Sequence, residues 1–108
     1  MNAAQSGVAE VFAALGDATR VALLQQLAAG GPGSATSLTA MTSISRQAVN
    51  RHLQILEGAG LVESERAGRE VLYSHRPGKA TQAADWLQEL NRAWEQQLQL
   101  VKAAAERM

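Results

Sequence analysis

The chain has 108 residues, no cysteine and a formal net charge of zero, with 10 basic and 10 acidic side chains. This length suffices for one small domain with a single core. The lack of cysteine excludes disulfide scaffolds, thiolate nucleophiles, thiol redox sensors and metal sites built on thiolates. No apolar run approaches the ~20 residues of a membrane-spanning helix, and the N-terminus lacks the features of a secretory signal. We therefore expect one cytoplasmic domain spanning residues 1–108.

The balanced charge is unevenly distributed along the chain. Residues 43–79 carry six basic and four acidic side chains, whereas each flanking segment has one acidic side chain in excess. Overall neutrality argues against a protein that coats nucleic acid or acidic membranes. A site-specific DNA binder stays compatible with it, because the positive excess is concentrated in the middle of the chain.

Three helices are expected in the first 42 residues. Apolar side chains recur at helical spacing in residues 8–15 and again in residues 21–28. Gly16 and Asp17 separate these stretches, and the Asp17 side chain can cap the second helix. Residues 30–34, which contain three glycines and a proline, predict a loop. A short helix is expected to follow, over about residues 37–41.

A capped helix, a hairpin and a long helix are expected in the remainder. Ser45 can cap a helix over about 45–58, which ends at the glycines flanking Ala59. Two β-like runs around Gly68 predict a hairpin over about 61–76. From about residue 81 to 107 there is no glycine or proline, which predicts a helix of roughly 25 residues, or ~38 Å. The expected fold is mostly helical with a small β-hairpin, namely four helices, two strands and a final helix. This is the order of a winged helix-turn-helix.

The helix at 45–58 separates into two faces. One arc of the helical wheel is apolar and includes one histidine; it comprises Ala48, Val49, His52, Leu53, Ile55 and Leu56. The other face carries amides and guanidinium groups, and it comprises Arg46, Gln47, Asn50, Arg51 and Gln54. Asn and Gln pair with adenine in the major groove, whereas Arg pairs with guanine or phosphate. The pattern therefore predicts a helix that reads DNA bases.

Two further features favour DNA over an ordinary solvated helix surface. Arg46 and Gln47 lie at the N-terminal end of the helix, where the dipole and free N–H groups favour phosphate. Arg66 and Arg69 flank the hairpin tip, where an arginine commonly contacts the minor groove or its phosphates. Cross-strand pairing of these two arginines with Glu65 and Glu70 in a solvated turn stays open as an alternative.

Four consecutive segments resemble the ArsR-type bacterial repressors. They are residues 14–20 (ALGDATR), 44–56 (ISRQAVNRHLQIL), 57–62 (EGAGLV) and 65–73 (ERAGREVLY). The resemblance implies a homodimer that binds an inverted repeat in a promoter, with the first and last helices at the dimer interface. It also implies that the recognition helix contributes Ser45, Arg46, Gln47, Asn50 and Arg51, and that the wing contributes Arg66 and Arg69. The polar face of the helical wheel adds Gln54 to the predicted DNA contacts.

The chain departs from the family members that sense metals. Many of these use a cysteine pair on the third helix, or Asp and His on the last helix, and here both cysteine and a histidine on the last helix are missing. We therefore predict no metal site and no cofactor. His52, inside the apolar arc, is expected to be a buried and hydrogen-bonded packing residue. His75 ends a strand without a nearby ligand partner.

The last helix carries a long apolar stripe with spacings of three and four residues. Such a stripe exceeds what one small core can cover, and packing against a second copy would bury it. The predicted dimer interface comprises Phe12, Leu87, Leu90, Trp94, Leu98 and Val101. Trp86 could pack within the monomer or at that interface. The spacing of Trp86 and Trp94 resembles that in a metal-independent ArsR subgroup. Two alternatives stay open for the effector, namely a small apolar ligand bound between the two copies, or no ligand.

An enzyme is not expected, because the sequence shows no catalytic Ser, His and Asp grouping, no phosphate-binding glycine loop and no metal-ligand spacing. We predict a sequence-specific DNA-binding transcriptional regulator, a repressor acting as a homodimer. The alternative is a winged helix used only for protein interaction.

Overall fold

A computed structural model of the chain describes residues 3–107. Helices α1 (Ala3–Leu15) and α2 (Ala18–Gly30) occupy the N-terminal part, as the apolar spacing predicts. Asp17 caps α2, because its side chain accepts a hydrogen bond of 3.1 Å from the backbone N–H of Arg20. That hydrogen bond is the main reason why the pKa of the Asp17 carboxyl lies below its usual value.

The segment after α2 differs from the expected loop. Gly33 and Ser34 form a short strand, β1 (Gly33–Ser34), which pairs antiparallel with Tyr73 and Leu72 of a later strand. A side chain at Gly33 would lie against the core leucines Leu27 and Leu38, about 3.5 Å from each. These are ordinary van der Waals distances, so the pairing does not depend on glycine; the strand was missed because two residues are too few to show a β pattern.

The short helix α3 (Ala35–Thr39) begins and ends two residues earlier than the sequence predicts. Ser34 and Ser37 form a reciprocal capping box, with backbone-to-side-chain hydrogen bonds of 3.1 and 3.0 Å. This pair of bonds fixes the helix start at Ala35, which lies in the core.

Helix α4 (Arg46–Gly58) has the predicted bounds and the predicted cap, with the Ser45 side chain accepting a 3.1 Å bond from the Ala48 N–H. Its apolar arc is narrower than predicted. The leucine and valine positions are fully buried, namely Val49, Leu53 and Leu56. Ile55 is 39% exposed because it lies at the edge of the arc, toward α1.

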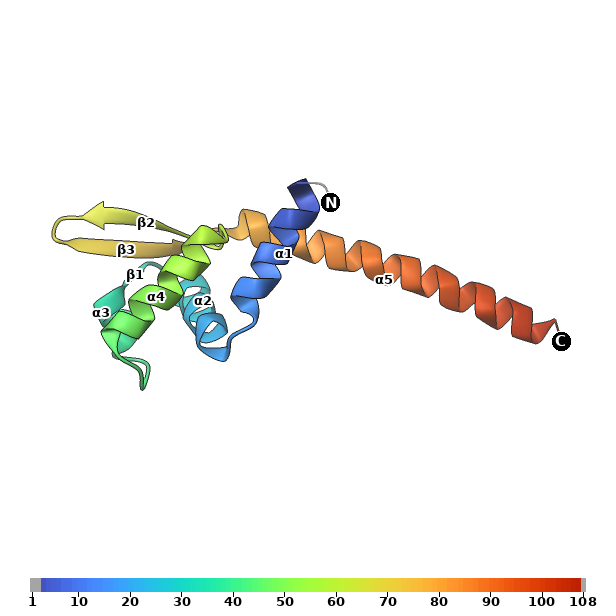
Figure 1. The fold of residues 1–108 in the computed structure, drawn as a ribbon, viewed down its shortest axis with the longest axis horizontal. Coiled ribbons are helices and arrows are strands. Elements are labelled where there is room, and N and C mark those ends of the chain that lie inside the picture. Colours follow the sequence, from blue (N-terminus) through green and yellow to red (C-terminus); the bar gives the residue numbers. More distant parts are fainter. Residues whose placement is uncertain (1–2, 108) are drawn as a thin grey trace.

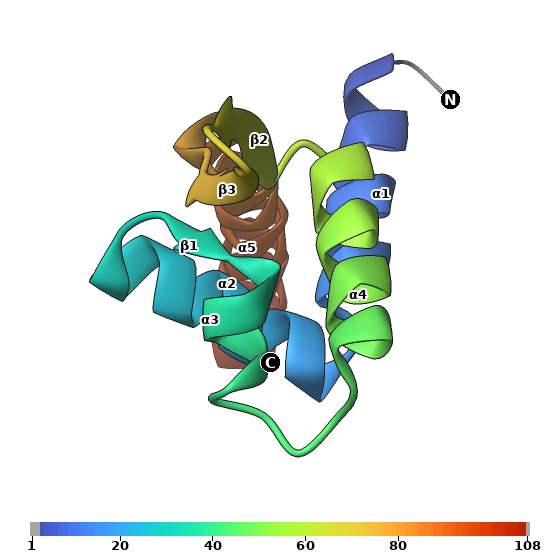
Figure 2. The same cartoon turned by 90° about the vertical axis from the view of Figure 1, so that its left-hand side faces the viewer.

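The predicted hairpin consists of β2 (Val62–Ala67) and β3 (Glu70–His75). Gly68 has a φ of +65°, a conformation that favours glycine and closes the tight turn. The sheet has the order β1-β3-β2, so it contains three strands rather than the two that were expected. Figure 2 shows the hairpin beside α3 and α4 on one side of the molecule.

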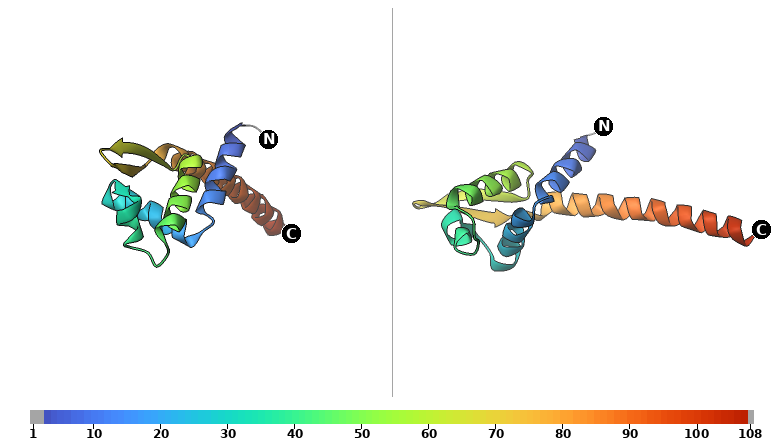
Figure 3. Two further views of the ribbon diagram at one scale, coloured as in Figure 1. Left: turned by 60° about the vertical axis from the view of Figure 1, so that its left-hand side comes forward. Right: turned by 60° about the horizontal axis from the view of Figure 1, so that its bottom comes forward.

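Helix α5 (Pro77–Glu106) has 30 residues and begins four residues before the predicted start. Pro77 occupies the first turn, where its missing N–H costs nothing and its fixed φ suits the helix. The helix therefore spans ~45 Å at 1.5 Å per residue. It projects far from the remaining elements, which gives the chain extents of 70 × 29 × 22 Å (Figures 1 and 3).

The core lies between α1, α2, α4 and the sheet. It is built from buried aliphatic side chains with one tyrosine, chiefly Val11, Leu23, Leu27, Leu38, Val49, Leu53, Leu56, Leu61, Val62 and Tyr73. The first turns of α5 join it through Ala83, and the Phe12 and Trp86 rings meet edge to face with centroids 5.9 Å apart. Among residues 3–107, no helix is long and apolar enough to cross a membrane.

Candidate nucleic-acid interface

The polar face of α4 is open to solvent, as the wheel predicts. Arg46, Gln47, Arg51 and Gln54 are exposed, whereas Asn50 is half-buried. Five of the predicted residues line one open depression of about 560 Å³, namely Ser45, Gln47, Asn50, Arg51 and Gln54. Three amide side chains and one arginine therefore project from a helix whose position is fixed by its buried opposite face.

A second groove joins this face to the wing. It measures about 200 Å³ and lies between α3, the start of α4 and the hairpin. Arg46 and Asn50 line it from α4, and Arg69, Glu70 and Tyr73 line it from the wing. The structure thus brings Arg69 together with the predicted recognition helix. Glu70 and Tyr73 in this groove are residues that the helical pattern could not place, because the hairpin folds over α4 only in three dimensions.

Arg66 does not line that groove. It lies on β2 opposite Val71, while Ala67 lies opposite Glu70. Neither tip arginine makes an ion pair within the described part of the chain, so the expected alternative of pairing with Glu65 or Glu70 is not seen. The guanidinium groups of Arg66 and Arg69 are consequently free to contact an anion.

The acidic residue of α4 is held away from the polar face. Glu57, in the last turn, accepts a hydrogen bond of 2.5 Å from the Ser64 hydroxyl on β2. Burial, and next the Glu57 carboxylate, raise the pKa of the Tyr73 phenol above its usual value. Throughout residues 3–107, the three ion pairs found involve neither Arg46 nor Arg51. The guanidinium groups of Arg46 and Arg51 are therefore not held in ion pairs within the described residues, although Glu70 lines the groove beside Arg46.

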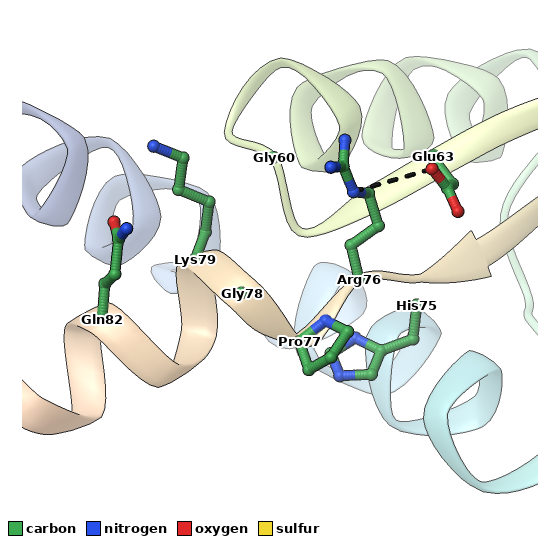
Figure 4. Close-up of a pocket in the computed structure, with 8 residues that line it drawn as sticks. All are labelled: Gly60, Glu63, His75, Arg76, Pro77, Gly78, Lys79 and Gln82. Carbon is green, nitrogen blue, oxygen red and sulfur yellow. Dashed lines mark ion pairs between the residues drawn. The ribbon is translucent and has the colours of Figure 1, made fainter.

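A third cavity, of about 470 Å³, lies at the base of the wing, away from the α4 N-terminus (Figure 4). The Arg76 guanidinium pairs there with Glu63 at 3.6 Å, and the Lys79 side chain extends from the first turn of α5 away from that helix. The His75 ring lies beside Pro77, and its Nδ1 is buried without a hydrogen-bond partner. This cavity joins the wing to α5 and does not include the predicted DNA-contacting residues.

His52 differs in part from its prediction. It is half-buried rather than buried, and its Nδ1 lies 3.2 Å from the Arg20 guanidinium. Arg20 is a residue whose role the sequence analysis missed. The signal that could have found it is the single arginine in residues 14–20 together with a histidine on an otherwise apolar arc. Among the residues that the structure describes, no group of three His, Asp or Glu side chains is placed to hold a metal ion.

Comparison with known proteins settles the family. A family described as a helix-turn-helix domain matches residues 15–65. The structure superposes on an ArsR-like transcriptional regulator from Rhodococcus sp. RHA1 with a TM-score of 0.85 and 38% sequence identity, covering 96% of this chain and 97% of that one. The chain belongs to the ArsR family of transcriptional regulators.

Other relatives of this ArsR-family protein agree. YuzN of Bacillus subtilis, an uncharacterized HTH-type transcriptional regulator, is 39% identical over 77 residues, which is 64% of this chain and 84% of YuzN. A homodimeric winged helix-turn-helix DNA-binding domain from Mycobacterium bovis has a TM-score of 0.66 and 27% identity, covering 82% of this chain and 81% of that domain. The protein is thus a winged helix-turn-helix regulator and not an enzyme.

Proposed function

We propose that this ArsR-family regulator binds an inverted-repeat operator as a homodimer and represses transcription by occluding a promoter. The observation that carries the proposal is the polar face of α4, which presents amides and arginines without a carboxylate in its depression and adjoins Arg69 of the wing. The proposed DNA contacts are made by Ser45, Arg46, Gln47, Asn50, Arg51, Gln54, Arg66 and Arg69.

The roles within this set follow from position. Gln47 and Asn50 lie near the N-terminal end of α4 and carry the paired donor and acceptor that read adenine in the major groove. Arg51 and Gln54 lie further along the same depression, where Arg51 can neutralise phosphate. Arg69 shares a groove with Arg46, so the wing and the helix can hold adjacent parts of one DNA backbone.

The proposed dimer rests on α5. Its outer part leaves large apolar side chains in solvent, and the proposed interface there comprises Leu87, Leu90, Trp94, Leu98 and Val101, with Phe12 from α1. Phe12 is half-buried against Trp86, so it offers the partner only its uncovered edge. A contiguous apolar stripe of this length is unusual on a monomer and is typical of an interface. The homodimeric M. bovis relative supports the same assembly.

We propose that the sensing mode is that of the metal-independent ArsR subgroup. The chain has no cysteine, and α5 carries no histidine. The known thiolate and α5 histidine sites therefore have no counterpart. Whether a small apolar ligand enters between the two α5 helices is a question that dimer stability in the presence of such ligands would answer.

The test is selection of bound duplexes from random DNA, followed by titration of the selected site and of a scrambled duplex. We expect an inverted repeat, and a log–log salt slope of roughly −5 to −7 for a dimer that neutralises about six to eight phosphates. A slope near zero, or equal affinity for both duplexes, would contradict the proposal and favour a protein-interaction module.

A further inference from the structure

The Arg20 side chain lies where the end of α1, the start of α2 and the middle of α4 meet. Its Nε donates to the Ala14 carbonyl at 2.6 Å, and its Nη2 donates to the Ala13 carbonyl at 3.5 Å. Both carbonyls belong to the last turn of α1, where helix carbonyls lack partners within the helix. Only 15% of the Arg20 side chain is exposed. Arg20 therefore fastens α2 to the C-terminal end of α1.

The same guanidinium also reaches the recognition helix. Its Nη1 lies 3.2 Å from Nδ1 of His52, a residue 32 positions away in the sequence. A guanidinium can only donate hydrogen bonds, so a hydrogen bond at this distance requires Nδ1 to accept, and that in turn requires the neutral tautomer with its proton on Nε2. His52 follows Arg51 directly and is two residues from Asn50, both of which line the proposed DNA-reading depression.

We propose that Arg20 and His52 are positioning residues for DNA recognition, which hold α4 at a fixed orientation to α1 and release it when His52 is protonated. This inference rests on the proposed function, because it assumes that α4 reads DNA. The α1 end of the contact is close to the proposed dimer interface, since Phe12 of α1 packs against Trp86 of α5. The Arg20–His52 contact thus joins the end of α1 that lies near the proposed dimer interface to the recognition helix.

Protonation weakens this contact for a simple chemical reason. A protonated imidazole would direct an N–H toward the Arg20 N–H, which puts two cationic donors at hydrogen-bond distance. Asp17, whose carboxylate lies 4.0 Å from the Arg20 Nη1, offers the charged ring a competing partner. The contact therefore requires a neutral His52 ring and is lost when the ring takes up a proton.

The other elements around α4 bring few titratable groups toward this ring. On α1, Glu10 lines a groove with Ile55 and Gly58, one turn or more along α4. Helix α3 has no titratable side chain. On β2, Glu63 pairs with Arg76 instead. Arg20 and Asp17 are thus the charged groups that face His52 from α2 and its cap.

The decisive experiment compares specific with non-specific DNA affinity between pH 8 and pH 5.5, a range that spans ordinary imidazole titration. His52→Gln keeps an acceptor oxygen that does not titrate, and His52→Leu removes the acceptor. His75→Gln is the matched control, because it removes the other histidine of the chain. Thermal unfolding at pH 8 shows that each variant is folded before its affinity is read.

At pH 8 we expect His52→Gln to match the wild type, whereas His52→Leu loses about tenfold in specific affinity and little in non-specific affinity. On going to pH 5.5, the ratio of specific to non-specific affinity should fall for the wild type and His75→Gln, and stay flat for His52→Gln. A wild-type pH profile in His52→Gln, or full specificity in His52→Leu, would overturn the positioning role while leaving the proposed function intact.

A second measurement needs no DNA. The imidazole nitrogen resonances of His52 at pH 8 should show an unprotonated Nδ1 and a protonated Nε2, and Arg20→Gln should shift the Nδ1 resonance. The opposite tautomer would overturn the proposal. A wild-type protein that prefers no duplex at pH 8 would instead contradict the proposed function, and the positioning role with it.

Discussion

The winged part of the chain, which comprises α1 to α4 and the sheet, buries its large apolar side chains, whereas the outer part of α5 exposes them. Leu53, Leu56 and Leu61 of the winged part are fully buried. On α5, Trp94 is 62% exposed and Val101 is 65% exposed. Of the thirty α5 residues, all of which the structure describes, Ala83 is the buried one. One region completes its own core, whereas the other presents a surface that a second molecule would complete.

This difference assigns the two regions different roles in the proposed function, namely DNA recognition and dimerisation. The core fixes the backbone of α4 and the wing, and that rigidity lets polar side chains on α4 meet base edges in one register. The projecting helix has no such core and gains stability only by association. Changes in the two regions should therefore have different consequences, and four predictions use that contrast.

The largest effect on folding should come from the core. Leu53→Ala should lower the free energy of unfolding by about 3 kcal/mol, because it leaves a cavity at a fully buried site. Leu98→Ala removes the same atoms from a side chain that is 42% exposed, and it should cost the diluted monomer no more than about 0.5 kcal/mol. Denaturant unfolding at low protein concentration measures both. Equal decreases in the free energy of unfolding would contradict the proposed difference between the two regions.

Trp94→Ala should weaken the dimer by about 2 to 4 kcal/mol, since a large aromatic side chain near the centre of an interface commonly dominates its affinity. Sedimentation at micromolar concentration should then shift toward the monomer. Thermal unfolding of the diluted protein should change little, because Trp94 lies outside the core. An unchanged dimer would remove Trp94 from the interface.

Substitutions on α4 should distinguish residues that recognise particular bases from residues that bind the DNA backbone. Asn50→Ala should cost about 1 to 3 kcal/mol of discrimination at particular base pairs, because it removes a bidentate contact. Arg51→Ala should weaken binding to all sequences about equally and make the salt slope shallower by about one per site. Titration of each variant against single-base-pair changes of the operator measures these effects. Should Asn50→Ala weaken every sequence equally, its assigned role would be wrong.

The smallest effect on DNA affinity should come from adding or removing a metal ion. Zinc added at micromolar concentration, or its removal with a chelator, should change operator affinity by less than about twofold, since the chain lacks thiolates and no α5 histidine is present. Affinity titrations in matched buffers test this expectation. A zinc-dependent release of DNA would place the protein among the metal sensors.

Local signals predicted two of the three helix starts that side chains cap, and they missed the one that Ser34 caps. Asp17 and Ser45 each accept the backbone hydrogen bond that their sequence positions suggest. The start of α5 was missed because proline usually ends a helix, whereas Pro77 lies in its first turn. The β1 strand was missed because it exists only through pairing with Tyr73, about 40 residues later, and such long-range pairing leaves little trace in the sequence.

In the candidate site, too, local sequence signals predicted some features, whereas others depend on contacts between distant residues. A helical wheel is enough to place Gln47, Asn50 and Arg51 on one polar face. It cannot show that Arg69 of the wing shares a groove with Arg46, or that Arg20 is the partner of His52. Both relations depend on the packing of separate elements, which only the folded chain displays.

The central claim is that the winged part reads DNA and α5 joins two such parts. Its most direct test is the affinity of wild type and Trp94→Ala for a full inverted repeat and for a single half-site. We predict that the wild type prefers the full repeat by about a hundredfold or more, because the second half-site is bound intramolecularly. Trp94→Ala should bind the two duplexes with nearly equal affinity at concentrations where it is monomeric. A full preference retained by monomeric Trp94→Ala, or no preference in the wild type, would contradict the account.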